Sequence, residues 1–328
     1  MRDSKRKAKE IGRRIAFFVI LAILFGMISS KTESAMLKSL HLVPLRDRDM
    51  YRIRQEKPYS IDVIIVGDSL SYTSVSPMQL WKEYGFTSFV CGQWGQKIGE
   101  TEYMLKTVLN RQKPKVVILE ANVLFRKQIK AGNINDGIES GLQYYLPVFR
   151  GHDMWKSLVM KKKYNRENYK GFSFRCKVKP YEKGNYIKKG AKKKKLPDTT
   201  LTHMERIIDM CRESGSELVL LGTPSPVNYR YAKGRAISEY AKEKSLDWID
   251  MNLLLKQIGI DWKTDSLDKG DHLNLSGAEK VTGYLGKYLS GKYDLPDHRE
   301  DPAYASWARE SVEYEKKAAL YLKKIRGD

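Results

Sequence analysis

Residues from two distant parts of the sequence could together perform acyl transfer. Ser69 stands two residues after the glycine that ends the expected strand 62–66, and His272 lies near the C-terminus beside Asp268 and Asp271. A serine hydroxyl is a weak nucleophile, and it becomes reactive when a histidine takes its proton and a carboxylate orients that histidine. These residue types predict Ser69 as a nucleophile and His272 as its general base.

Two further positions could stabilise the negative oxygen that forms during acyl transfer. Gly95 ends the sequence Gly-Gln-Trp-Gly at 92–95, and Asn122 follows the apolar run 116–119. Like Ser69, both follow an expected strand, and open parallel sheets bind their ligands at the carboxyl ends of the strands. The glycines could also serve only a turn, and Asn122 could be an ordinary helix cap.

The order serine, glycine, asparagine, then aspartate with histidine, resembles that of the SGNH or GDSL hydrolase superfamily over about residues 61 to 289. The resemblance implies that Ser69 is the nucleophile and His272 the general base. It implies an oxyanion hole made by the backbone N–H groups of Ser69 and Gly95 and by the Asn122 side chain.

The chain departs from the usual pattern of that superfamily in two places. The family's aspartate stands three residues before the histidine, where this chain has Lys269. Asp268, four residues before, is the favoured acid, with Asp265 and Asp271 as alternatives. An asparagine that often opens the family's second block is replaced here by Val90.

Other hydrolase classes need residues that the chain lacks. The α/β hydrolases require Gly-x-Ser-x-Gly around the nucleophile, and Ser71 occupies the place of the second glycine. The sequence has no His-Glu-x-x-His motif, and Cys91, Cys176 and Cys211 are too far apart for a zinc pair. We therefore expect neither a metal nor a cofactor.

Alternating strands and helices are expected to position these residues. Apolar runs bounded by glycine or polar residues predict strands at 62–66, 88–91, 116–120, 217–221 and 247–249. Helices are expected at 77–84, 100–110, 201–214, 231–244 and 276–289, the last capped by Ser276. This alternation predicts an α/β fold with a parallel, doubly wound sheet. The family resemblance implies a flavodoxin-like three-layer α/β/α sandwich with five strands.

The N-terminus predicts a membrane anchor. Residues 1–14 carry seven Lys or Arg and two acids, and residues 15–28 are apolar throughout. With 29–30 added, this segment approaches the length of a span. Because 27–31 match the small-residue preference of signal peptidase poorly, an uncleaved anchor at 15–30 is favoured over a cleaved signal peptide and secretion. The basic tail 1–14 would stay in the cytoplasm, with the catalytic domain outside the cell.

Most of the positive charge is confined to two segments. Residues 1–14 have a net charge of +5 and residues 156–195 one of +14, out of +21 for the chain. Lysine and aromatic residues mixed in this way could bind a polyanion, and a solvated insertion is the alternative. The lysines concerned are Lys161, Lys162, Lys163, Lys192, Lys193, Lys194 and Lys195. Nucleic acid is not expected as a partner, because the domain is expected to be exported.

The expected organisation has a lead-in or stalk after the anchor and one catalytic domain. The lead-in covers 31–59, and the hydrolase-like domain covers 60–290 with a basic insertion at 123–200. The remainder, 291–328, is expected to contain an amphipathic helix that docks on the domain or on the membrane surface.

These features predict an extracytoplasmic serine esterase or acyltransferase that works through a serine acyl-enzyme. Its substrate would be O-acyl groups, acetyl or D-alanyl, of a cell-envelope polysaccharide or teichoic acid. The anchor with its Ser and His also resembles D-alanyl transfer and polysaccharide O-acetylation proteins, which implies a membrane-bound O-acyltransferase as partner. The alternative is a catalytically silent, polyanion-binding scaffold on the same fold.

Overall fold

A five-stranded parallel sheet forms the centre of the protein. The computed structural model describes residues 2–126, 130–151, 154, 169–190 and 194–327. The strands are β1 (Val63–Gly67), β2 (Ser88–Gly92), β3 (Val116–Glu120), β4 (Glu217–Gly222) and β5 (Asp247–Asp250). Their order is β2-β1-β3-β4-β5, with every pair parallel. This is the flavodoxin-like order, so the predicted fold class is confirmed.

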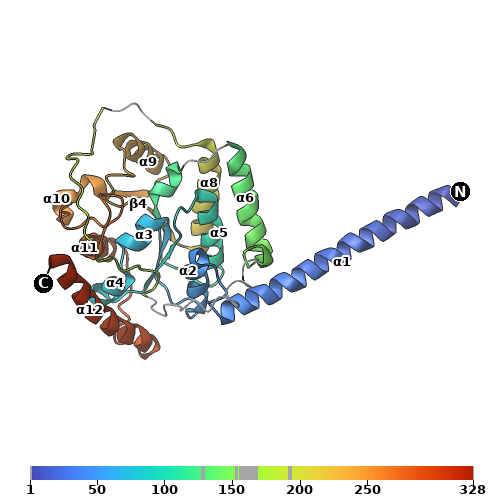
Figure 1. The fold of residues 1–328 in the computed structure, drawn as a ribbon, viewed down its shortest axis with the longest axis horizontal. Coiled ribbons are helices and arrows are strands. Elements are labelled where there is room, and N and C mark those ends of the chain that lie inside the picture. The colour runs from blue at the N-terminus through green and yellow to red at the C-terminus, as the bar shows by residue number, and fades with distance from the viewer. Residues whose placement is uncertain (1, 127–129, 152–153, 155–168, 191–193, 328) are drawn as a thin grey trace.

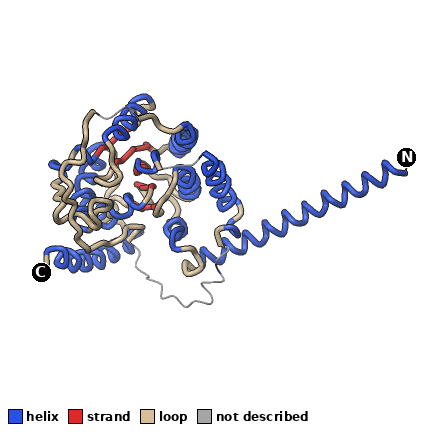
Figure 2. The backbone as a smooth tube through the Cα atoms, turned by 45° about the horizontal axis from the view of Figure 1, so that its top comes forward, coloured by secondary structure: helices blue, strands red, loops and turns tan. Residues whose placement is uncertain are grey.

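Helices cover both faces of the sheet, which lies at the centre of the body in Figure 2. The main ones are α4 (Pro77–Tyr84), α5 (Ile98–Leu109), α8 (Asp198–Ser214), α9 (Tyr231–Glu243) and α11 (Leu275–Lys292). Successive strand residues point to opposite faces. Leu119 therefore packs in the core that contains α5 and α8, whereas its neighbour Ile118 packs in the core that contains α4 and α11.

The helix after His272 begins one residue earlier than predicted. Asn274, not Ser276, is its N-cap, and the Asn274 side chain accepts a hydrogen bond from the N–H of Gly277. Ser276 instead donates its hydroxyl to Asp265 at 2.8 Å. The expectation for Ser276 was wrong because both residue types favour the cap position, and only the tertiary contact to Asp265 distinguishes them.

The expected anchor and the first part of the lead-in form one continuous helix. The rest of the lead-in forms short helical turns that pack on the body. Helix α1 (Arg2–Lys38) projects from the body (Figure 1), and in the described residues it is the one helix long and apolar enough to cross a membrane, by length and composition. Then come η1 (Leu45–Asp47), α2 (Arg48–Arg52) and η2 (Ile53–Gln55). Met36 and Tyr51 are fully buried. The lead-in is therefore part of the body and not an extended stalk, because its apolar side chains complete one core.

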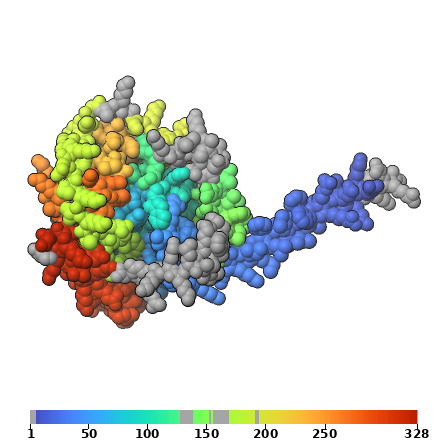
Figure 3. Space-filling view, viewed as in Figure 1, coloured from blue at the N-terminus to red at the C-terminus, as the bar shows by residue number. Residues whose placement is uncertain are grey.

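The insertion after β3 contributes a helix and a surface strap. Short η3 (Ala121–Phe125) precedes α6 (Lys130–Tyr145) and η4 (Pro147–Phe149). Residues 169–190, which we call the strap, then cross the surface beside the later parts of the chain (Figure 3, lime green). The Lys170 carbonyl accepts the N–H of Val90 at 2.9 Å, so the strap covers the edge strand β2. The predicted polyanion residues 161–163 and 192–193 lie outside the described residues.

The C-terminal segment docks on the body. After η6 (Pro302–Tyr304), helix α12 (Ala305–Arg326) packs on α4 and α11. Trp307 of α12 lies 5.5 Å from Trp81, measured between ring centres. Lys170 of the strap is almost fully buried, with Glu310 of α12 at 3.2 Å and Glu56 at 2.9 Å. The remaining short elements are α3 (Ser69–Ser74), η5 (Met251–Leu253) and α10 (Leu255–Ile258).

Candidate active site

Ser69 is the first residue of α3, directly after β1. Asp68 caps this helix, with its Oδ1 accepting the Leu70 N–H at 2.9 Å. A side chain at Gly67 would meet the Cβ of Glu120 at 2.6 Å, so glycine is needed where β1 passes β3. As the first helical residue, Ser69 has a backbone N–H with no partner inside the helix. The strand end thus presents both the hydroxyl and the N–H of Ser69.

Ser69, His272 and Asp268 form one chain of hydrogen bonds. His272 Nε2 lies 2.8 Å from Ser69 Oγ, and His272 Nδ1 lies 2.8 Å from Asp268 Oδ2. Because a carboxylate can only accept, Nδ1 carries the proton, and the unprotonated Nε2 accepts from the serine hydroxyl. The imidazole is therefore oriented to take the Ser69 proton.

The turn before His272 explains the extra residue between acid and base. Lys269 and Gly270 both have positive φ, 65° and 88°, which folds the chain tightly between Asp268 and His272. Asp268 Oδ1 accepts the His272 N–H at 2.7 Å, which closes the turn. The strap also contacts this turn, because the Lys179 carbonyl accepts the Lys269 N–H at 2.9 Å. A spacing of four residues thus delivers the carboxylate to Nδ1.

The two alternative acids are placed differently. Asp271 Oδ2 is 3.8 Å from His272 Nδ1, and its Oδ1 accepts from Asn228 at 2.6 Å. Asp265 is fully buried and lies 2.7 Å from the Lys280 ammonium. Asp265 therefore stabilises the start of α11 and does not contact the histidine. Of the three candidates, Asp268 has the geometry of the orienting acid.

Asn122 contacts Asp68 at the start of α3, and Gly95 lies near Arg126, which contacts the same aspartate. One N–H of the Asn122 amide donates to Asp68 Oδ2 at 2.7 Å, which leaves the second N–H for an oxyanion. Gly95 has a φ of +68°, and a side chain there would lie 3.9 Å from the Arg126 guanidinium. Arg126 was not anticipated from the sequence. Its Nε donates to the same Asp68 oxygen at 2.8 Å, so Asp68 fixes the positions of both the Asn122 amide and the Arg126 guanidinium.

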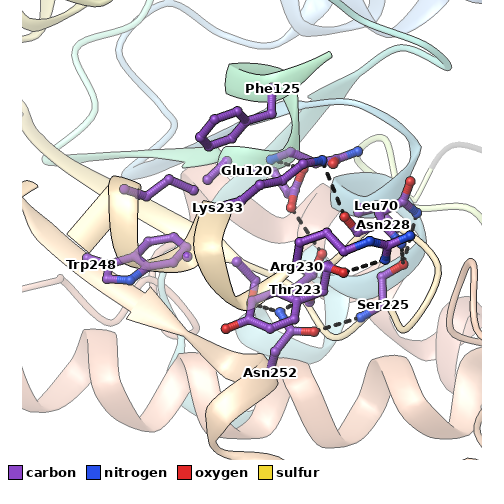
Figure 4. Close-up of a pocket in the computed structure, with 16 residues that line it drawn as sticks. Leu70, Glu120, Phe125, Thr223, Ser225, Asn228, Arg230, Lys233, Trp248 and Asn252 are labelled. Carbon is purple, nitrogen blue, oxygen red and sulfur yellow. Dashed lines mark hydrogen bonds between the residues drawn. The ribbon is translucent and has the colours of Figure 1, made fainter. Parts of the chain in front are cut away.

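A small pocket of about 40 Å³ lies beside Leu70 and Asn122, and the buried Glu120 forms part of its wall (Figure 4). Glu120 accepts the Asn122 N–H at 3.1 Å and the Thr223 hydroxyl at 3.2 Å. Burial raises the pKa of Glu120 well above its ordinary value, and the nearby charge of Asp68 raises it further. A neutral Glu120 can therefore support the backbone of Asn122 without adding a second negative charge beside Asp68.

An open cavity of about 540 Å³ gives access to Ser69 and His272. Its aromatic walls are formed by Tyr72, Trp94, Phe174 and Tyr321, and its basic walls by Arg175, Lys177 and Lys179 of the strap. The strap is fixed there through the Arg175 carbonyl, which accepts the Leu275 N–H at 2.8 Å. The sequence did not assign these individual residues to the site, because nothing local in 169–190 shows which of them contact a loop about a hundred residues later.

A metal would have to use the same residues as the hydrogen-bond chain. In the described part of the structure, Asp268, Asp271 and His272 offer ligand atoms within 4.8 Å of one another. Binding through His272 Nδ1 would replace its bond to Asp268. The existing bonds instead match a histidine that exchanges a proton with Ser69.

Among known proteins, this chain is distantly similar to several solved structures. No family model matches the chain, and no curated protein matches it. A candidate acylhydrolase from Bacteroides fragilis is 11% identical, with 76% of this chain and 96% of that chain covered and a TM-score of 0.41. TesA is 14% identical, with 70% and 98% covered and a TM-score of 0.37. A candidate platelet activating factor from Streptococcus pneumonia is 15% identical, with 84% and 99% covered and a TM-score of 0.40. Since these scores are low, the assignment of the site rests on its own geometry.

Proposed function

We propose that the protein is a serine esterase or O-acyltransferase that works through an acyl-enzyme on Ser69. The observation that carries the proposal is the hydrogen-bond chain from Ser69 through His272 to Asp268, with 2.8 Å at each step. A serine with this partner chain is activated for attack on an ester carbonyl. The cavity above it is open enough to admit the acyl group and part of an alcohol.

The reaction follows from the atoms present. Ser69 Oγ bonds to the ester carbonyl carbon while its proton passes to His272 Nε2. The carbonyl oxygen becomes negative and is stabilised by the N–H groups of Ser69 and Gly95 and by the Asn122 amide. When the C–O bond to the alcohol breaks, His272 returns the proton to the leaving oxygen. Water or an acceptor hydroxyl then attacks the acyl-Ser69 ester, again with His272 as the base.

The proposed location is the outer face of a membrane, with O-acetyl or O-D-alanyl groups of a cell-envelope glycan or teichoic acid as substrate. The exposed apolar surface of α1 and the basic residues before it support this orientation. Phe149 of η4 stacks on Phe25, which lies within the apolar segment, with ring centres 6.1 Å apart. This contact supports a body that lies close to the end of the proposed anchor.

Labelling with a fluorophosphonate tests the nucleophile. We expect the full-length protein in detergent to label on Ser69, and Ser69→Ala to abolish the labelling. Thr73→Ala, which changes a neighbouring hydroxyl that donates to the Ser69 carbonyl at 2.8 Å, serves as the matched control and should still label. Equal labelling of wild type and Ser69→Ala would show that the nucleophile is assigned wrongly.

Hydrolysis and transfer differ only in the group that resolves the acyl-enzyme. A radiolabelled acetyl ester incubated with and without an added glycan or polyol acceptor separates them. Free acetate at the same rate in both tubes identifies an esterase. Label that moves to the acceptor, with less free acetate, identifies a transferase.

A further inference from the structure

Arg126 and Asn122 bind the same oxygen atom of Asp68. Both belong to the short turn after β3, with Asn122 inside η3 and Arg126 directly after it. The Asn122 amide donates to Asp68 Oδ2 at 2.7 Å, and Arg126 Nε donates to the same oxygen at 2.8 Å. Arg126 Nη2 lies 2.7 Å from it as well. Because a guanidinium group is planar and rigid, these two contacts fix the orientation of Arg126 as well as its distance from Asp68.

Arg126 also balances a buried negative charge. Asp68 is fully buried, and a buried carboxylate is costly unless a cation pairs with it. Among the described residues, Arg126 is the only cation that forms an ion pair with Asp68. The neighbouring Glu120 adds no second charge, because burial raises its pKa well above the ordinary value. The Arg126 side chain is 32% exposed, so the balancing charge comes from the solvent side of the turn.

The charge of Asp68 lies close to the place where the oxyanion would form. Asn122 gives one amide N–H to Asp68 and has the second for the oxyanion, so the two acceptors would stand about 5 Å apart on either side of one nitrogen. Two negative charges at this distance repel each other unless a positive charge lies beside them. A side chain at Gly95 would be 3.9 Å from Arg126 Nη1. Arg126 is thus close to two of the three expected oxyanion donors.

We propose that Arg126 is a positioning residue of the oxyanion hole. It holds Asp68 so that the second N–H of the Asn122 amide points at the reacting carbonyl, and its charge offsets the repulsion between Asp68 and the oxyanion. This repulsion arises only when the carbonyl oxygen becomes negative, so Arg126 acts on the transition state and not on substrate binding. The inference rests on the proposed acyl-transfer function and adds a residue to its oxyanion hole.

Substitutions at Arg126 test the proposal in the full-length protein in detergent, with para-nitrophenyl acetate as the ester. Arg126→Gln removes the charge and should lower kcat by about 10- to 100-fold, somewhat less than the loss of a direct oxyanion donor. KM should change by less than about threefold, since substrate binding does not use the charge. Arg126→Lys keeps the charge but loses the rigid pair of donors, so its kcat should lie between those of wild type and Arg126→Gln.

A matched control separates this effect from a general loss of surface charge. Arg212 is an exposed arginine on α8 that pairs with Asp209 at 3.0 Å. Arg212→Gln should therefore have the kcat and KM of wild type. Circular dichroism and the thermal midpoint of each variant show whether it is folded. A loss of kcat in Arg126→Gln that Arg126→Lys does not restore at all would contradict the role of the charge.

Chemical rescue provides a second readout. Arg126→Ala should leave a space that solvent can enter, because the arginine side chain is partly exposed. Millimolar guanidinium chloride should then restore part of the lost kcat, whereas sodium chloride at the same concentration should not. Asn122→Ala, which lacks the amide itself, should not respond to guanidinium. A recovery of kcat that accompanies an equal recovery of the thermal midpoint would assign Arg126 to stability and overturn the proposal.

Fluorophosphonate labelling distinguishes failure of this inference from failure of the proposed function. Attack on the phosphorus also places negative charge on an oxygen, so Ser69 in Arg126→Gln should label more slowly than in wild type. Wild-type kcat in Arg126→Gln, or an effect confined to KM, would overturn the role of Arg126 and leave the esterase intact. Absence of both ester turnover and labelling in wild type would instead refute the proposed function, and this inference with it.

Discussion

At the scale of single residues, three carboxylates hold His272 and Asn122 in place around Ser69. Asp268 orients His272, Asp68 holds the Asn122 amide, and Glu120 supports the Asn122 backbone. Asp68 and Glu120 are buried side by side, and Glu120 has the raised pKa. The three carboxylates therefore have different roles, and substitutions that replace a carboxylate by an amide can distinguish them.

Asp268→Asn should lower kcat by about 10³ to 10⁴-fold, because the amide would favour the wrong histidine tautomer. Asp271→Asn is the matched control. Its carboxylate is 3.8 Å from His272 Nδ1 and partly exposed, so its loss should cost less than about fivefold. Ester hydrolysis by the two variants decides between the acids. A larger loss in Asp271→Asn would reverse the assignment.

Glu120→Gln should stabilise the protein relative to wild type, and increasingly so as the pH rises. The pKa of Glu120 is raised above its ordinary value of 4.5 in the folded state, so above pH 4.5 the unfolded chain loses a proton that the folded protein retains. Wild type therefore loses about 1.4 kcal/mol of stability per pH unit from this group in that interval, and the glutamine variant does not.

Urea unfolding at a series of pH values measures this difference. Glu213→Gln, at an exposed position on α8, is the control and should follow wild type. A difference between Glu120→Gln and wild type that stays constant from pH 5 to pH 8 would show that Glu120 is charged in the folded protein.

At the scale of elements, the strap joins three parts of the molecule that are distant in sequence. It bonds to the edge strand β2 through Lys170, to α3 through the Tyr72 carbonyl, which accepts the Ser173 N–H at 2.9 Å, and to the catalytic loop through Arg175 and Lys179. It also supplies the basic wall of the catalytic cavity. Stability and catalysis should therefore depend together on its attachment to β2.

Gly171→Ala should detach the strap from β2. The added Cβ would lie 1.9 Å from the Val90 carbonyl oxygen, at a φ of +89°. Gly184→Ala is a matched control, because it has a φ of +70° with open space around it. The control carries only backbone strain of about 1–3 kcal/mol, whereas Gly171→Ala adds a steric clash and should unfold at lower temperature. Equal thermal midpoints for the two variants would argue against a close contact between the strap and β2.

At the scale of the whole molecule, one helix serves both as the expected anchor and as part of the body. The first part of α1 exposes its apolar side chains, whereas Met36 is fully buried, and Glu33 accepts from the Tyr51 hydroxyl at 2.7 Å and pairs with Arg54. The exposed apolar part of α1 therefore ends before Glu33, and the part of α1 that packs on the domain follows it.

Two truncations test this boundary. A protein that starts at residue 31 should be soluble without detergent and fold like the full-length protein. A protein that starts at residue 41 also loses Met36, and removing one fully buried side chain of this size costs about 2–5 kcal/mol. Chemical unfolding compares the two. Equal stability would show that the second half of α1 contributes nothing to the domain.

The sequence by itself determined the sheet and the identity of the central pair. Runs of β-branched residues that end at polar residues are local signals, so β3 was predicted at its observed bounds. The strands β2, β4 and β5 end one residue later than predicted, and β1 is shifted by one residue at both ends. Ser69 and His272 could be paired in advance because a serine, a glycine, an asparagine and an aspartate with a histidine follow one another in that order, each beside an expected strand end or helix start. Few residue types can act as a nucleophile or as its base, so few other pairs had to be considered.

The tertiary structure decided which acid reaches His272 and what surrounds the site. Asp268 is selected by a turn in which Lys269 and Gly270 adopt positive φ, and a lysine in that conformation is not readable from residue type. The cavity at Ser69 gathers Tyr72, Arg175 and Tyr321 from elements separated by more than a hundred residues each. Periodicity and local preference report on neighbours along the chain, whereas a binding cavity depends on distances that exist only after the chain has folded.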